Sequence, residues 1–443
     1  MMGTLQWKQR GASTWIAHWS ESKMCVVPPI LSSNALSYVL PQHSQFFMGI
    51  VMTSASGEPA RGPAHGTYLA VASIMIRPSS RIRIGVIGLG HFAQAAVLPA
   101  IEQLLDVELT ALVSGSRHKL EEIGRRHGVR ALCSYDQLDE LLESGVVDAV
   151  YIAVPNDLHA ELTLVAARHG GHVLCEKPMA PTEAECMQMI RVCEQRRVKL
   201  MIAYRLHFEA ANLVAIEVAR GGEIGEPRLF SSVFAMQVRG GNVRTQPRRG
   251  AGPLYDIGIC CLNAARYLFR TEPVEAMAMK LCGRDPRFAA VDEAFAVALR
   301  FPHDRVAQFT CSFGARDRAH YQVIGTDGFL TLDNAYEYAA DEMTLQVVGK
   351  HGDKIRTFPK RDQIAAEIEY FARCIRDDVE PEPSGWEGMA DVRILQAIQT
   401  SARFGRTVPI DPVPRPRRPD LGQEIRIPAH EMPPLVDVEQ PTK

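Results

Sequence analysis

The chain has 443 residues, of which 46% are hydrophobic and 23% charged, and its formal net charge is −2. This length suits two domains with additional terminal segments, and the composition is typical of a globular protein with a large core. The charge excludes the basic surface of a nucleic-acid-binding protein, and no apolar run reaches the roughly 18 residues of a membrane helix. The ten cysteines contain no C-x-x-C pair, so we expect no metal, no disulfides and a cytoplasmic location.

The first 80 residues show no sustained periodicity and no basic stretch leading into an apolar signal segment. We expect residues 1–80 to be disordered, or to arise from an upstream start codon in the gene model. Met75 lies just before "IRPSSRIRIGVIGLG" and would make a natural start.

A glycine motif follows the first clear strand pattern. The run "RIRIGVI" is β-branched, as a buried parallel strand requires, and it leads into G-x-G-x-x-A. Gly88 permits a tight turn, Gly90 lets the backbone approach a pyrophosphate, and Ala93 lets the next helix pack closely. Because a strand and a helix flank the motif, we interpret it as a dinucleotide-binding loop that includes His91 and Phe92.

The end of the next strand pattern, "VELTALVSGSRHKLEE", bears on the type of cofactor. NAD-preferring sites carry an acidic residue here, whereas this sequence has hydroxyl and basic side chains. Such groups suit a 2′-phosphate, so NADP(H) is favoured over NAD(H), although a polar surface loop is an alternative. The residues concerned are Ser114, Ser116, Arg117 and Lys119.

Two further strand-and-helix patterns end in polar residues. "VDAVYIAVPNDLH" leads to Pro155, Asn156 and His159, and "GHVLCEKPMA" leads to Glu176 and Lys177. Alternating strands and helices predict an α/β fold with a doubly wound parallel sheet, whose ligands lie beyond the carboxyl ends of the strands. We therefore expect Lys177 to face a ligand, whereas most lysines are solvated at the surface.

Taken together, these motifs resemble the Gfo/Idh/MocA oxidoreductase family, and most of all its glucose–fructose oxidoreductase branch. The similarity runs from about residue 81 to 409 and includes "GVIGLGHFA", "SGSRHK", "AVPNDLH", "CEKPMA", "AYRLHFE" and "GPLYDIGICCLN". It implies a Rossmann domain (81–203) and an α+β domain (204–410) with a large, mostly antiparallel open sheet. The last helix would pack back on the Rossmann domain, and residues 411–443 would form a proline-rich tail.

The resemblance also implies roles for individual residues. Ser114 and Lys119 would hold the 2′-phosphate, and Lys177 would reach both the nicotinamide and a substrate hydroxyl. The cofactor would further contact the glycine loop, the ends of the strands and Arg205, and the substrate would contact Tyr204, Asp256 and Asn263. Asp256 and residue 260 are four apart, so on one helix they share a face.

Cys260 departs from the family pattern, which has histidine or tyrosine at this position. A thiol can accept a proton, but it is short and a weak hydrogen-bond partner. Three interpretations remain open: Lys177 carries out the proton transfer, the protein is inactive or sluggish, or Cys260 is a redox-sensitive thiol. Cys261 is expected to lie in the core, and adjacent helical cysteines point about 100° apart, which argues against a disulfide.

The leading hypothesis is an NADP(H)-dependent oxidoreductase acting on a sugar or polyol hydroxyl or carbonyl. The alternatives are a non-catalytic dinucleotide-binding regulator and a nicotinamide-dependent glycosidase. The loop with Arg244, Arg248 and Arg249 indicates a solvated basic loop more readily than an anionic substrate. The open sheet and the tail, which wraps a neighbour in oligomeric relatives, favour a homo-oligomer, either a dimer or a tetramer.

Overall fold

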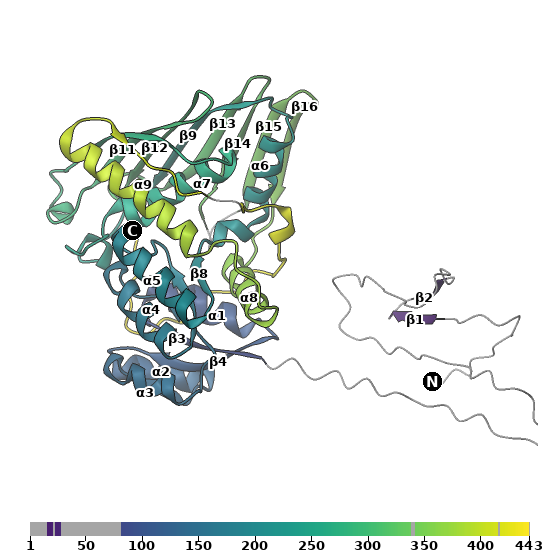
Figure 1. Ribbon diagram of the computed structural model, residues 1–443, viewed down its shortest axis with the longest axis vertical. Coiled ribbons are helices and arrows are strands. Elements are labelled where there is room, and N and C mark those ends of the chain that lie inside the picture. Colours follow the sequence, from purple (N-terminus) through teal and green to yellow (C-terminus); the bar gives the residue numbers. More distant parts are fainter. Residues whose placement is uncertain (1–15, 21–22, 28–80, 338–341, 415–416, 443) are drawn as a thin grey trace, which may run out of the picture. The chain divides into compact units, whose positions relative to one another are not determined.

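The computed structural model describes residues 16–20, 23–27, 81–337, 342–414 and 417–442 (Figure 1). Residues 1–79 and 80–443 form separate units. In the first unit, β1 (Ile16–Ser20) and β2 (Lys23–Val27) pair as antiparallel strands. The rest of the segment 1–80, including Met75, lies outside the described residues, so our expectation for it stays a prediction.

A parallel sheet forms the first part of the second unit. Its six strands lie in the order β5-β4-β3-β6-β7-β8, and every neighbouring pair is parallel. The strand order reverses beside β3, and ligands of doubly wound sheets bind outside the carboxyl ends of the strands at that point. The strands are β3 (Ile82–Ile87), β4 (Val107–Val113), β5 (Ala131–Cys133), β6 (Ala149–Ile152), β7 (His172–Glu176) and β8 (Leu200–Ala203).

Helices connect these strands and cover the sheet (Figure 1). Most residues of β3, β6, β7 and β8 are buried on both faces, as is usual for parallel sheets, whereas the short edge strand β5 is only partly buried. The helical segments are η1 (Ala93–Val97), α1 (Leu98–Glu102), α2 (Arg117–His127), η2 (Tyr135–Gln137), α3 (Leu138–Glu143), η3 (Asn156–Leu158), α4 (His159–Arg168) and α5 (Glu183–Arg196).

The second sheet has nine strands in the order β16-β15-β14-β13-β9-β12-β11-β10-β17. All neighbours are antiparallel except β9 and β12, which are parallel. The fold class predicted from the sequence is therefore confirmed. The strands are β9 (Pro227–Ala235), β10 (Glu275–Leu281), β11 (Ala294–Phe301), β12 (Arg305–Ser312), β13 (Arg318–Gly325), β14 (Phe329–Asp333), β15 (Met343–Gly349), β16 (Gly352–Phe358) and β17 (Val408–Pro409).

Helices cover one face of this large sheet, and buried and exposed residues alternate along strands such as β11 and β12 (Figure 1). Helix α9 packs on both β10 and α5 and so joins the two sheets. The remaining helical segments are η4 (Arg205–Phe208), α6 (Ala210–Arg220), η5 (Val243–Thr245), η6 (Leu254–Gly258), α7 (Ile259–Phe269), η7 (Pro286–Phe288), α8 (Gln363–Arg376), α9 (Gly385–Phe404) and η8 (Leu421–Gln423).

The described parts of the C-terminal segment, 411–414 and 417–442, have little regular structure beyond η8 and pack against other residues of the same chain. Arg418 forms an ion pair with Glu272, and His430 lies 2.6 Å from the carboxylate of Asp362. The segment then follows the first two helices of the Rossmann domain. Elsewhere, no helix among the described residues is both long and apolar enough to span a membrane.

Candidate functional site

A cavity of about 530 Å³ lies between the carboxyl ends of the parallel strands and the second domain. It brings together most of the site residues predicted from the sequence, although they are spread over more than 170 positions. These are Gly88, Gly90, His91, Phe92, Ser114, Lys119, Pro155, Asn156, Glu176, Lys177, Tyr204, Arg205, Asp256, Cys260 and Asn263.

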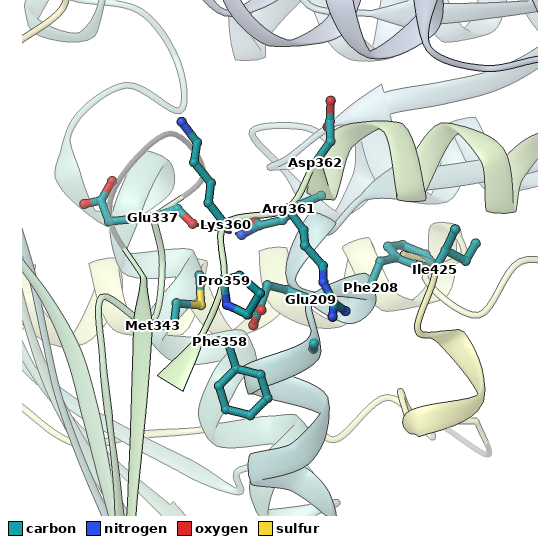
Figure 2. Close-up of a pocket in the computed structure, with 12 residues that line it drawn as sticks. Phe208, Glu209, Glu337, Met343, Phe358, Pro359, Lys360, Arg361, Asp362 and Ile425 are labelled. Carbon is teal, nitrogen blue, oxygen red and sulfur yellow. Dashed lines mark hydrogen bonds between the residues drawn. The ribbon is translucent and has the colours of Figure 1, made fainter. Parts of the chain in front are cut away.

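A second hollow lies beside Glu209, Glu337 and Arg361 (Figure 2). Its volume is about 20 Å³, which is room for roughly one water molecule. It is therefore too small for a nucleotide or a sugar, and the larger cavity is the candidate site.

The glycine loop forms one end of the cavity. Gly88 has φ +97°, and a Cβ there would lie 2.4 Å from the carbonyl oxygen of Ala153, so only glycine fits. A Cβ at Gly90, by contrast, would meet no atom within 4 Å, which leaves the backbone open to an approaching ligand. Ala93 begins the first helical turn and is buried without lining the cavity. This is the arrangement that a pyrophosphate requires.

The end of β4 supplies hydroxyl and ammonium groups to the cavity. Ser114 and Lys119 line it, and no acidic residue lies between positions 114 and 119. Ser116 instead caps α2, accepting a hydrogen bond from the backbone nitrogen of Lys119 at 3.3 Å. Arg117 is exposed, pairs with Glu121 at 2.7 Å and does not line the cavity. Of the four side chains that we expected near a 2′-phosphate, two therefore line the cavity, Ser114 and Lys119, and two do not, Ser116 and Arg117.

His159 does not line the cavity, contrary to our expectation. Its ring nitrogens lie 2.8 Å from the carbonyl oxygen of Pro178 and 2.9 Å from that of Val154. Burial lowers the pKa of the imidazole. His159 therefore ties the end of β6 to the loop that carries Lys177, whose peptide bond to Pro178 is cis.

Lys177 lies at the centre of the cavity. Its Nζ donates a hydrogen bond to the backbone oxygen of Asp256 at 2.6 Å and lies 3.3 Å from the Asp256 carboxylate. Burial is the largest single influence and opposes the charged lysine, but the acidic groups around Lys177, with Asp256 foremost, together outweigh it and raise the pKa of Lys177. The side chain is therefore an ammonium group at neutral pH.

Arg244 binds the other side of Asp256, donating from Nε to Oδ2 at 2.6 Å. Burial opposes ionisation of this carboxyl, but Arg244 and then Lys177 outweigh it and hold the pKa of Asp256 well below its usual range. Arg248 and Arg249 are exposed, as we expected for a solvated loop, and together with Arg244 they line the cavity. The contacts of these arginines with acids could not be predicted from the sequence, because Asp157 and Glu185 belong to the other domain and the contact of Arg244 with Asp256 forms only on folding.

Glu176, beside Lys177, is a second carboxyl in the cavity. It accepts a hydrogen bond from the Tyr151 hydroxyl at 2.7 Å, and the same hydroxyl lies 3.5 Å from buried Glu367. Burial raises the pKa of both carboxyls, and each disfavours the charge of the other. A carboxyl that resists ionisation therefore stands next to the Lys177 ammonium.

Cys260 and Asp256 both line the cavity, so they do share a face. Burial raises the pKa of the Cys260 thiol despite the opposing charges of Lys177 and Arg205. The thiol is therefore protonated at neutral pH and is a poor base. Cys261 is fully buried in the core, as expected, and both cysteines are free.

Asn263 lines the cavity but uses its amide inside the protein. The nitrogen donates to Glu387 at 2.9 Å and to Asp391 at 3.0 Å, and the oxygen lies 2.8 Å from the ring of His207. Both amide protons are thus committed, which leaves only an oxygen lone pair for the substrate contact we predicted.

The Arg205 side chain, like that of Asn263, is held by hydrogen bonds to other protein groups. Its guanidinium donates to the side chain of Gln363 and to the backbone oxygen of Tyr336. A third bond runs to the backbone oxygen of Glu337 at 3.4 Å, and all three of these partners belong to the second domain, so Arg205 links the end of β8 to that domain.

The sequence analysis missed several residues that line the cavity. Tyr135 follows β5, a three-residue strand without β-branched residues, and the rule that ligands lie at strand ends could have found it. The other missed residues come from the second domain, where no motif marks them: Phe234, Met236, Asn242, Tyr336, Glu337 and Ile364. No cluster of His, Cys, Asp or Glu suited to a metal ion occurs among the residues that the structure describes.

Comparison with known proteins agrees with this geometry. Residues 82–204 match the oxidoreductase family with an NAD-binding Rossmann fold, and residues 213–331 match the GFO/IDH/MocA C-terminal domain. The chain belongs to the Gfo/Idh/MocA family. It is therefore an NAD(P)-dependent oxidoreductase by family, as the sequence motifs indicated.

Several members of this family are similar over most of their length. An NADP-dependent D-xylose 1-dehydrogenase of Haloarcula marismortui is 31% identical over 74% of this chain and 93% of its own. The solved aldose–aldose oxidoreductase of Caulobacter crescentus is 35% identical, with a TM-score of 0.70, over 74% of this chain and 100% of its own. A 3-ketoreductase of Actinomadura kijaniata, solved with NADP and TDP-benzene, is 26% identical over 73% of this chain and 98% of its own, with a TM-score of 0.67.

Proposed function

We propose that this protein transfers hydride between NADP(H) and a carbon of a sugar or polyol that carries a hydroxyl or carbonyl group. The position of Lys177 is the observation that carries the proposal. Its ammonium lies in a cavity that has the glycine loop at one end and Asp256 and Arg244 at the other. Relatives named as sugar dehydrogenases and reductases support the substrate class.

The cavity fits the proposed cofactor. Gly88 and Gly90 leave room for a pyrophosphate at a helix N-terminus, and Ser114 with Lys119 would hold a 2′-phosphate. When bound, the nicotinamide accepts or donates the hydride. The absence of an acidic residue at positions 114–119 supports NADP(H) over NAD(H).

Lys177 is the group we propose for proton transfer. As an ammonium it can donate a proton to a substrate carbonyl oxygen while hydride arrives from the cofactor. In the opposite direction the neutral Lys177 amine would take the hydroxyl proton as the hydride leaves. Asp256 would hold Lys177 in place and keep it charged. Cys260 would lie beside the substrate without exchanging a proton, because its thiol is neutral and short.

The proposal is tested by purifying the protein, denaturing it and identifying any nicotinamide nucleotide that is released. The protein is then assayed with NADP⁺ or NADPH and a panel of sugars, polyols and their oxidised forms, following the absorbance of the reduced cofactor. We expect turnover with at least one sugar or polyol, and we expect Lys177→Met to lower it at least ~100-fold.

A non-catalytic regulator is the second candidate, and Cys260 is the observation that favours it. In that case the protein would bind NADP(H) but turn over no member of the panel. Turnover that appears only in Cys260→Tyr would identify an enzyme disabled by this one position. Turnover in the unmodified protein would exclude the regulator.

We also propose a homo-oligomer in a reducing, cytoplasmic compartment. Met277, Met279 and Leu281 lie on one face of β10 with 57%, 69% and 56% of their surface exposed, which supports association through this sheet. The nine cysteines whose side chains the structure describes are free thiols, as expected where disulfides do not form. Sedimentation of the purified protein would distinguish a dimer or tetramer from a monomer.

A further inference from the structure

Part of this chain has no counterpart in a solved relative. The aldose–aldose oxidoreductase is matched over its full length by 74% of this chain, or about 328 of 443 residues. Residues 81–443 number 363, so about 35 residues of this part have no counterpart.

The end of the C-terminal segment is attached to the glycine loop. The backbone nitrogen of Val436 donates to the Gln94 side-chain oxygen at 2.7 Å, and the Gln94 side-chain nitrogen donates to the Val436 oxygen at 3.0 Å. The same nitrogen lies 3.0 Å from the carbonyl oxygen of Leu89, between the two glycines of the motif. Gln94 and Val436 are 3% and 8% exposed. The segment is thus built into the turn that faces a pyrophosphate.

Beyond Val436 the segment crosses from the Rossmann domain to the second domain. Gln440 lies 3.1 Å from the ring of His91, which lines the cavity. The carbonyl oxygen of Pro441 then accepts a hydrogen bond from the backbone nitrogen of Arg239 at 3.0 Å, and Thr442 pairs with Val238. Met236 and Asn242, on either side of this last contact, also line the cavity.

We propose that residues 435–442 form a strap that closes the pyrophosphate end of the cavity and must detach before NADP(H) can enter or leave. The inference rests on the proposed cofactor, and it assigns to this strap the control of how long the cofactor stays bound. Detachment of the strap requires the two hydrogen bonds between Val436 and Gln94 to break, together with the contacts of Gln440 with His91 and of Asp437 with His118. Local opening of a short segment of this kind can occur without unfolding of the whole protein.

The test measures the rate at which NADPH leaves the full chain and a variant that ends at Pro434. NADPH fluorescence is followed in a stopped-flow instrument after an excess of NADP⁺ is added. We expect release to be at least tenfold faster in the shortened protein, with faster binding as well, because the same barrier is removed in both directions. A release rate within about twofold of that of the full chain would overturn the proposal.

Point variants separate loss of the strap from misfolding. Asp437→Ala combined with Gln440→Ala removes the side-chain contacts with His118 and His91 and keeps the full length. We expect faster release here too, whereas Glu439→Ala, an exposed acidic neighbour with no recorded partner among the described residues, keeps the original rate. Equal rates in the double variant and the control would contradict the strap.

The outcomes also separate the strap from the proposed function. If NADPH binds and its release is unchanged by shortening, the strap is wrong and the proposed cofactor stands. If neither the full chain nor the shortened protein binds NADP(H), both proposals are wrong. Tighter NADPH binding with unchanged release after shortening would identify the segment as an obstacle to binding and would also overturn the strap.

Discussion

The Lys177 ammonium is held against Asp256 by a 2.6 Å hydrogen bond to the backbone oxygen and a 3.3 Å contact with the carboxylate. The two residues come from different domains, one after β7 and the other in the turn before α7. Arg244 occupies the second carboxylate oxygen, so the acid is shared between two cations. This triplet keeps both Asp256 and Lys177 charged inside a partly buried site.

The first prediction concerns how kcat/KM falls at acidic pH. Replacing Arg244 by Gln removes the largest charge that holds the pKa of Asp256 low, so we expect that pKa to rise toward its usual value. The acid limb of kcat/KM should then move to higher pH by on the order of one unit. Arg248→Gln is the matched control, since Arg248 lines the same cavity but pairs with Asp157. The same acid limb in both variants would contradict the assigned role of Asp256.

The same pKa links Asp256 to stability. Because its folded-state pKa lies below the unfolded value of about 3.9, ionised Asp256 stabilises the fold fully above that pH. This contribution is lost as the pH falls toward the folded-state pKa. We therefore expect Asp256→Asn to flatten the acid side of a plot of the free energy of unfolding against pH, as measured by urea denaturation.

The second prediction separates the two candidates for proton transfer. Cys260→Ala should change kcat by less than about threefold, because the thiol is neutral at working pH, whereas Lys177→Met should lower it at least ~100-fold. Both variants are measured with saturating cofactor and the best substrate of the panel. If Cys260→Ala is as damaging as Lys177→Met, then the thiol takes part in the chemistry and Lys177 alone does not suffice.

The sequence correctly predicted those features of the fold that depend on residues close together in the chain. The strand before Gly88, the open position at Gly90 and the burial of Cys261 follow from periodicity and from the properties of glycine. The short strand β5 was missed because three residues of intermediate burial show no periodic pattern. Its neighbour Tyr135 was missed with it.

Residues whose roles depend on distant partners were harder to predict. Arg244 was interpreted as solvated because its acid, Asp256, lies on a different element and meets it only after folding. His159 and Asn263 were assigned to the ligand, yet their hydrogen bonds serve the protein itself. A sequence motif can predict that a polar residue lies near a site. Whether its polar atoms bind a ligand or other protein groups depends on how the neighbouring elements pack.

The third prediction concerns cofactor choice. Lys119→Ala should raise the KM for NADP⁺ by about 10- to 100-fold, the effect of losing a hydrogen bond between charged groups, and change the KM for NAD⁺ by less than about twofold. Arg117→Ala is the matched control: it removes a cation two residues away that does not line the cavity. Equal effects of the two variants would indicate that Lys119 acts only through the general charge of the loop.

The last prediction concerns the buried charges behind the site. Arg266 on α7 is fully buried and pairs with Glu272, Glu387 and Asp391 at 2.6, 2.6 and 2.5 Å. Removing its guanidinium takes a buried cation away from Glu387 and Asp391, while Glu272 keeps its ion pair with Arg418. Arg266→Met should therefore lower the free energy of unfolding by about 3–5 kcal/mol.

Arg300→Met is the matched control for Arg266→Met. Arg300 also pairs with an acid, Glu275, but 62% of its side chain is exposed, so its loss should cost less than about 1 kcal/mol. Urea denaturation of both variants gives the comparison. Because Asn263 donates to Glu387 and Asp391, loss of Arg266 should also disturb the turn of α7 that carries Cys260. Equal stability of the two variants would show that the buried acids are neutral in the folded protein.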